Sequence, residues 1–182
     1  MNTSNIRHAI GAALVPFVML GATAALASPG EDHAAEANIG QAGDITHIDR
    51  VIEVDLGEMY FDPGSFDVER GETVRFVLNN SGRVVHEFAI GTEEMQVMHE
   101  QEMRSLMADG FMTTRELRHD RMIEAGRMHL DANSRLLEPR ETTELVWTFS
   151  GEQDELIIAC NVPGHRRAGM EALVTIGADH AS

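Results

Sequence analysis

A short segment near the C-terminal end of the chain limits its possible folds and functions more than any other part. Cys160, His165 and Met170 stand on one loop directly after a strand-like run, so a thiol, an imidazole and a thioether are close in sequence. A thiolate with imidazoles and a weak thioether suits copper that alternates between Cu(I) and Cu(II), because it partly satisfies both oxidation states. The segment therefore predicts a copper site that still lacks a second histidine.

His86 is the best candidate for that histidine. Side chains alternate between the two faces of a strand, so His86 shares a face with Phe88 and Ile90 and is predicted to point into the core. The same alternation places two other strand-end residues on inward faces: Cys160 with Leu156 and Ile158, and Met170 with Ala172, Val174 and Ile176. The alternative is a buried free cysteine, a core histidine and a core methionine that are neighbours by chance.

These residues resemble the cupredoxins, the type 1 blue-copper proteins. The Cys-x4-His-x4-Met spacing, with a Pro-Gly pair before the histidine, is similar to the loop of rusticyanin-like members. The resemblance implies an all-β fold, a Greek-key β-sandwich. It also implies four copper ligands: His86, Cys160 and His165 in a near-trigonal plane, and Met170 as the long axial ligand.

One position departs from the cupredoxin pattern. Many cupredoxins carry a small polar residue such as Asn or Ser after the first histidine, where it ties the two ligand loops together. This chain has Glu87 there. The hydrogen bonds around the copper, and with them the redox potential, are therefore an open question for the structure.

Residues 1–27 are predicted to be a signal peptide for export to the periplasm. They hold one arginine, no acidic residue and an apolar stretch that ends in Ala25-Leu26-Ala27, so cleavage is expected before Ser28. An uncleaved membrane anchor is the alternative.

The single cysteine of an exported protein cannot form an internal disulfide, and its thiol needs protection in an oxidising compartment. Copper ligation would protect it.

The formal charge of -16 limits the partners. It becomes -17 when the one arginine of the signal peptide is removed, which argues against nucleic acid or an anionic membrane as a partner. Arg166 and Arg167 lie beside His165 and are candidates for docking an acidic redox or copper-donor protein. The alternative is that they pair with carboxylates of the same chain.

The remaining pattern predicts one domain. Residues 28–47 are rich in alanine, glycine and acids and are expected to form a flexible leader. Residues 48–182 are expected to form a single cupredoxin domain, because apolar residues recur there at every second position between turn signals. This alternation stops after Gly91 and resumes near Thr142, so residues from about 92 to 141 are predicted to be an insertion. Its helix formers predict one or two helices covering the sandwich.

The insertion is rich in methionine and histidine and is a candidate for a second, Cu(I)-binding region. Thioethers are soft ligands that select Cu(I) and survive where free thiols are oxidised. The candidate ligands are Met95, Met98, His99, Met103, Met107, His119, Met122, Met128 and His129. The alternative is that the methionines only fill gaps between a helix and the sheet.

The combination of a cupredoxin core and such an insertion resembles the CopI-type copper-tolerance cupredoxins of the periplasm. It implies a protein that binds copper, supports one-electron transfer and contributes to copper tolerance. A dedicated, diffusible electron carrier with a structural insertion is the alternative. We expect no enzyme activity apart from oxidation of Cu(I) at the same centre, because a separate catalytic copper needs further histidine clusters.

Overall fold

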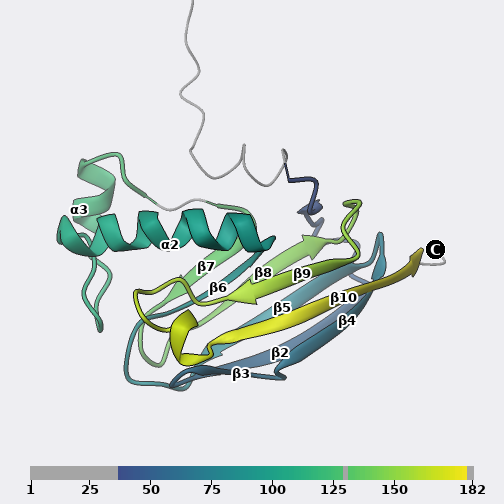
Figure 1. Ribbon diagram of the computed structural model, residues 1–182, viewed down its shortest axis with the longest axis horizontal. Helices are drawn as coiled ribbons and strands as arrows, with labels where there is room; N and C mark the ends of the chain where they lie inside the picture. The colour runs from purple at the N-terminus through teal and green to yellow at the C-terminus, as the bar shows by residue number, and fades with distance from the viewer. Residues whose placement is uncertain (1–36, 129–130, 180–182) are drawn as a thin grey trace, which may run out of the picture.

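The computed structural model describes residues 37–128 and 131–179, and in these residues ten strands form two facing sheets (Figure 1). The first sheet consists, in spatial order, of β1 (Gln41–Ala42), β8 (Thr142–Thr148), β5 (Thr73–Asn80), β2 (Arg50–Gly57) and β3 (Tyr60–Asp62). The second consists of β4 (Ser65–Arg70), β10 (Glu171–Asp179), β9 (Glu155–Ala159), β6 (His86–Gly91) and β7 (Ser134–Leu137). The all-β sandwich predicted from the sequence is confirmed.

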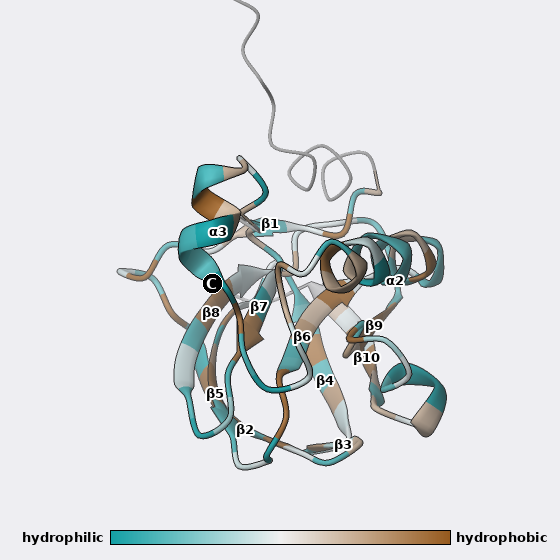
Figure 2. Cartoon of the chain, turned by 90° about the vertical axis from the view of Figure 1, so that its left-hand side faces the viewer, coloured by the Kyte–Doolittle hydropathy of each residue, from teal (hydrophilic) through white to brown (hydrophobic). Residues whose placement is uncertain are grey.

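In both sheets, strands that are far apart in sequence pair with one another. β2 and β5 are parallel, as are β4 and β10, and the other neighbours are antiparallel. Parallel neighbours cannot be joined by a tight hairpin, so each such pair requires the chain to cross to another part of the fold. Apolar stretches occur on strands of both sheets in Figure 2, as expected for strands that cover a shared core.

Aromatic rings fill the centre of that core. The rings of Phe66 and Phe88 pack edge-on with centroids 6.4 Å apart, and Phe61 packs edge-on against Phe88 at 5.9 Å. Phe76 of β5 and Phe149, which directly follows β8, extend the cluster. Edge-on packing places the positive edge of one ring against the negative face of the next. Phe88 belongs to the same strand face as His86, so this packing fixes the strand that starts at the histidine.

Helix α2 (Glu93–Ala108) packs against β6 and β9, two inner strands of the second sheet (Figure 1). It begins at Thr92, whose hydroxyl accepts a hydrogen bond from the Met95 N–H, and two acidic residues follow in its first turn. Both features stabilise the N-terminal end of a helix. The buried residues of α2 include Met103 and Leu106, which join the core.

The insertion contains the expected helices, since α3 (His119–Glu124) is a second, short helix after α2, and β7 also adds an edge strand to the second sheet by pairing with β6. One expectation about the chain's organisation is corrected. The leader does not extend to residue 47, because Ile39 is fully buried and β1 pairs with β8. A two-residue strand is too short for its alternation to be recognised in sequence. The predicted signal peptide and residues 28–36 lie outside the described residues.

Candidate metal centre

Three of the predicted ligands meet at one end of the sandwich. His86 is the first residue of β6, Cys160 directly follows β9, and His165 lies on the loop between β9 and β10. His86 and Cys160 are fully buried, and His165 is 7% exposed. One potential ligand atom from each lies within 4.8 Å of the other two. His86 therefore lies close enough to the cysteine to share a metal ion with it, and its role as a ligand remains a prediction.

The distances between the donor atoms fit a shared metal ion. Nδ1 of His165 lies 3.3 Å from the Cys160 Sγ, and Nδ1 of His86 lies 3.9 Å from it. Metal–nitrogen and metal–sulfur bonds of about 2.0 and 2.3 Å separate two trigonal ligand atoms by roughly 3.7 Å. The observed distances lie on either side of that value. The two imidazole rings are 5.1 Å apart and tilted by 58°, so both can direct Nδ1 toward one point beside the sulfur.

The opposite nitrogen of His86 shows how this ring is held. Its Nε2 is buried and has no hydrogen-bond partner within the described part of the chain. A Cβ at Gly82 would lie 2.9 Å from that atom, so a larger residue at position 82 would push the ring away. The ring is therefore positioned by close packing, with Nδ1 on the side of the thiol.

Backbone hydrogen bonds close the ligand loop. The Cys160 N–H donates to the Met170 carbonyl at 3.1 Å, and the Met170 N–H donates to the His165 carbonyl at 3.1 Å. The single 3₁₀ turn η1 (Arg166–Ala168) ends at Gly169, whose φ of +100° lies in the left-handed region that favours glycine. This turn returns the chain to the cysteine, and Met170 is fully buried there. The axial role of Met170 remains a prediction.

Burial sets the protonation of the three donors. Burial, and then the nearby His165, lower the pKa of His86 to about 4. Burial also lowers the pKa of His165 and raises the pKa of the Cys160 thiol. At neutral pH both imidazoles are therefore neutral and keep a lone pair for a metal ion. The thiol must lose a proton before it can bind one.

Glu87 provides the link that the sequence left open. Its N–H donates to the Cys160 Sγ at 3.3 Å, and its fully buried carboxylate accepts a hydrogen bond from the Asn161 N–H at 3.2 Å. Glu87 therefore ties the strand that carries His86 to the loop that carries the cysteine. Glu87 stands at the position where many cupredoxins carry a smaller polar residue. Its carboxylate brings a buried negative charge close to the thiol.

The candidate ligands of the insertion are divided among several environments. Met95, Met103 and Met122 are buried in the hydrophobic core, as packing residues are. His99 has both ring nitrogens against carboxylates, with Nε2 2.8 Å from Glu87 and Nδ1 3.1 Å from Glu102. The sequence pattern indicates His99 only as a candidate copper ligand, because an ion pair between a helix and a sheet leaves no local signal.

The other members of the set also do not form one cluster. Met98 is 39% exposed, His119 is exposed, and Met107 and Met128 are partly buried. His119, Met122 and Met128 line a pocket of about 320 Å³, whereas Met95, Met98 and His99 line a separate one. His129 lies outside the described residues. A second copper region therefore remains a prediction, and the candidates with exposed surface are Met98, Met107, His119 and Met128.

The two arginines beside His165 differ in their surroundings. Arg166 forms ion pairs with Glu93 at the start of α2 and with Glu171, the latter at 3.2 Å. Arg166 therefore pairs with carboxylates of its own chain, which was the alternative to docking a partner. Arg167 is exposed. A docking role would have to rest mainly on Arg167.

Comparison with known sequences finds copper-binding relatives. The family described as copper binding proteins, plastocyanin/azurin family, matches residues 48–177. A copper-resistant cuproprotein CopI from Pseudomonas aeruginosa is 38% identical, over 93% of this chain and 97% of the relative. A second protein of that name, from Rubrivivax gelatinosus, is 33% identical over 90% of this chain and 94% of the relative.

Comparison with solved structures agrees with the fold. Auracyanin B matches with a TM-score of 0.56 and 17% identity, covering 78% of this chain and 99% of auracyanin B. A reduced auracyanin from Roseiflexus castenholzii matches with a TM-score of 0.51 and 19% identity, covering 72% of this chain and 99% of the auracyanin. At these identities the match concerns the fold alone.

Proposed function

The chain belongs to the plastocyanin/azurin family of copper-binding proteins, and we propose that it serves copper tolerance in the periplasm. The proposed ligands are His86, Cys160 and His165 in a near-trigonal arrangement, with Met170 as the axial ligand. The observation that carries the proposal is the buried set of three donors whose ligand atoms lie within 4.8 Å of one another. Copper tolerance is supported by two relatives that are named copper-resistant cuproproteins.

The residues of the site suit electron transfer. Copper bound there supplies one-electron chemistry by alternating between Cu(I) and Cu(II). His86, Cys160 and Met170 are fully buried, so the protein excludes water and holds the donors in place in either oxidation state. His165 is the one proposed ligand with some exposed surface, which makes it the expected route for the electron. We therefore propose binding and electron transfer rather than catalysis on an organic substrate.

The periplasmic location rests on the apolar N-terminal segment and the single cysteine. Among the residues that the structure describes, none of the helices has the length and hydropathy to cross a membrane.

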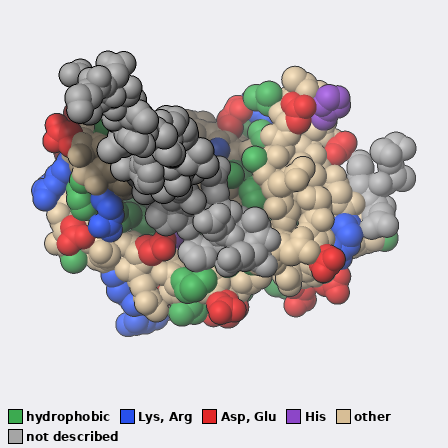
Figure 3. All heavy atoms as spheres, turned by 90° about the horizontal axis from the view of Figure 1, so that it is seen from above, with side chains coloured by type: hydrophobic (Ala, Val, Ile, Leu, Met, Phe, Trp, Pro, Cys, Tyr) green, Lys and Arg blue, Asp and Glu red, His purple; other side chains and the backbone are tan. Residues whose placement is uncertain are grey.

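Acidic side chains are spread over the face seen in Figure 3, with basic ones in separate places. This charge distribution suits a soluble redox or copper-donor partner, for which exposed Arg167 is the candidate contact.

A dedicated electron carrier is the second candidate function. The burial of Met95, Met103 and Met122 favours it, because these side chains have a sufficient role in packing the insertion. The exposed or pocket-lining Met98, His119 and Met128 favour copper tolerance with additional Cu(I) binding. Replacing this second group tests the two functions against each other.

Growth in copper tests the proposed function. In cells that lack the gene, wild type is expected to restore tolerance and Cys160→Ser to fail. The combined variant Met98→Leu, His119→Gln and Met128→Leu is expected to keep the visible absorption band, lower the number of Cu(I) ions bound per chain and restore tolerance only partly. Met103→Leu, in the core, is the control and should match wild type. A wild-type protein that fails to restore tolerance would favour the electron carrier, and wild-type stoichiometry in the combined variant would mean that these three residues bind no additional Cu(I).

The pH dependence of copper uptake follows from the protonation of the site. Cu(II) affinity is expected to fall about tenfold per pH unit from roughly pH 8 to 5, because the Cys160 thiol releases one proton when it binds. His86 begins to compete with the metal near its pKa of about 4, so the slope should steepen there. Competition titrations with a chelator of known affinity measure this slope. An affinity independent of pH would exclude the thiolate as a ligand.

A further inference from the structure

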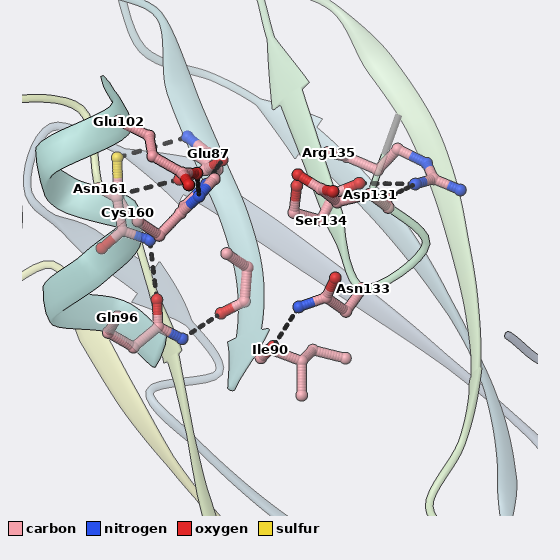
Figure 4. A network of polar contacts seen from close by, with 12 residues as sticks. Glu87, Ile90, Gln96, Glu102, Asp131, Asn133, Ser134, Arg135, Cys160 and Asn161 are labelled. Carbon is pink, nitrogen blue, oxygen red and sulfur yellow. Dashed lines mark hydrogen bonds and ion pairs between the residues drawn. The ribbon is translucent and has the colours of Figure 1, made fainter. Parts of the chain in front are cut away.

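Helix α2 contacts the metal centre through the buried polar side chain of Gln96. Its Nε2 donates to the carbonyls of Ala89 and Ile157, both at 2.9 Å. Its Oε1 accepts from the Asn161 side chain at 2.7 Å (Figure 4). Gln96 is 2% exposed. Because Asn161 directly follows Cys160, one side chain of the insertion joins β6, β9 and the start of the ligand loop.

His99 lies about one turn further along α2 and pairs with the residue next to the other ligand. Its Nε2 is 2.8 Å from an oxygen of Glu87, whose carboxylate has no solvent exposure. Burial alone would lower the pKa of His99, but Glu87 and Glu102 raise it to about 10, so the ring is cationic at neutral pH. A buried carboxylate is costly unless it is paired. The helix of the insertion therefore supplies the cation that Glu87 needs.

Glu87 connects His99 to the Cys160 thiol. Its N–H donates to the Cys160 Sγ at 3.3 Å, and its second carboxylate oxygen accepts from the Asn161 N–H at 3.2 Å (Figure 4). Hydrogen bonds to the sulfur of a ligating cysteine tune the redox potential of a copper centre. A continuous set of short contacts therefore runs from His99 through Glu87 to the sulfur.

We propose that His99 is a positioning residue for the copper centre, and that α2 helps to set its redox potential through the His99–Glu87 pair and the Gln96–Asn161 hydrogen bond. This proposal rests on the proposed function. His99 holds Glu87 in the orientation that keeps the N–H of residue 87 on the sulfur. Its positive charge also balances a negative charge that would otherwise favour Cu(II) over Cu(I).

His99→Gln is the direct test, because glutamine keeps an N–H donor for Glu87 and removes only the charge. The variant is expected to shift the Cu(I)/Cu(II) equilibrium toward Cu(II) by about tenfold, which is about 59 mV to lower potential for one electron. His99→Lys, which returns a cation, should recover most of the shift. Arg104→Gln is the matched control: it removes a positive charge from the same helix, at an exposed residue paired with Glu100. Its potential should remain that of wild type.

A second measurement uses the metal-free protein. The wild-type Cys160 thiol is fully buried and should react slowly with iodoacetamide. His99→Leu removes both the donor and the charge, so Glu87 and the ligand loop should loosen and the thiol should react at least several-fold faster. His99→Gln should lie between the two, and Arg104→Gln should match wild type.

The outcomes separate this proposal from the proposed function. A wild-type potential in His99→Gln together with wild-type thiol reactivity in His99→Leu would overturn the positioning role, even if both variants were less stable. Equal shifts in His99→Gln and Arg104→Gln would overturn it as well, because they would reflect general charge. A wild-type protein that takes up no copper would contradict the proposed function, and the thiol reactivities would then decide the positioning role alone.

Discussion

Cys160→Ser is expected to abolish the intense visible absorption of the Cu(II)-loaded protein. The absorption arises from charge transfer between a thiolate and copper, and a serine hydroxyl cannot replace the thiolate at neutral pH. Copper affinity should also fall by more than the roughly 10- to 100-fold that loss of an outer hydrogen-bond partner causes, because a primary, soft ligand is removed. Absorption spectra and copper stoichiometry of purified wild type and variant measure both effects.

Three further variants make this experiment specific. His86→Ala should abolish or strongly alter the band, and a wild-type spectrum there would show that another histidine is the ligand. Met170→Leu should keep the copper and raise the potential, since the axial ligand is weak. His119→Ala, at an exposed residue of α3, is the control and should keep the wild-type spectrum. An intense band that survives in Cys160→Ser would disprove thiolate ligation.

The grouping of His86 and Cys160 could be predicted because these proposed ligands stand at strand ends. Alternation placed both on buried faces, and both are fully buried, although every other residue of β6, Glu87 included, is buried as well. The strands that flank the predicted insertion end and begin where the alternation stops and resumes, since β6 ends at Gly91 and β8 begins at Thr142. These features are local patterns, and local patterns can be recognised in a single sequence.

The contacts around the centre could not be predicted, because they depend on how separate elements dock. His99 and Met103 are four residues apart and therefore lie on the same side of α2, but this spacing could not show that Glu87 would lie against the ring. Arg166 pairs with Glu93, which is 73 residues away in sequence. The docking of α2 on β6 and β9 creates both pairs, and it follows from the packing of the whole core.

Copper is expected to raise the unfolding midpoint of the protein strongly. The donors meet only in the folded chain, because His86 and Cys160 are 74 residues apart in sequence. A ligand that binds only the native state adds about 4 kcal/mol at a thousandfold excess over its Kd. For a chain of this size each kcal/mol shifts the midpoint by roughly 2–4 °C, so a rise on the order of 8–16 °C is expected.

Thermal unfolding of metal-free and Cu(II)-loaded protein, followed by circular dichroism, measures this rise. The metal-free protein should still unfold cooperatively, because the aromatic core around Phe76 and Phe88 contains no ligand. A chelator should return the loaded protein to the lower midpoint. Cys160→Ser should show little of the rise, whereas the exposed-site control His119→Ala should show all of it. Equal midpoints with and without copper in wild type would mean that the folded chain offers no site, since a metal that binds only the native state must stabilise it.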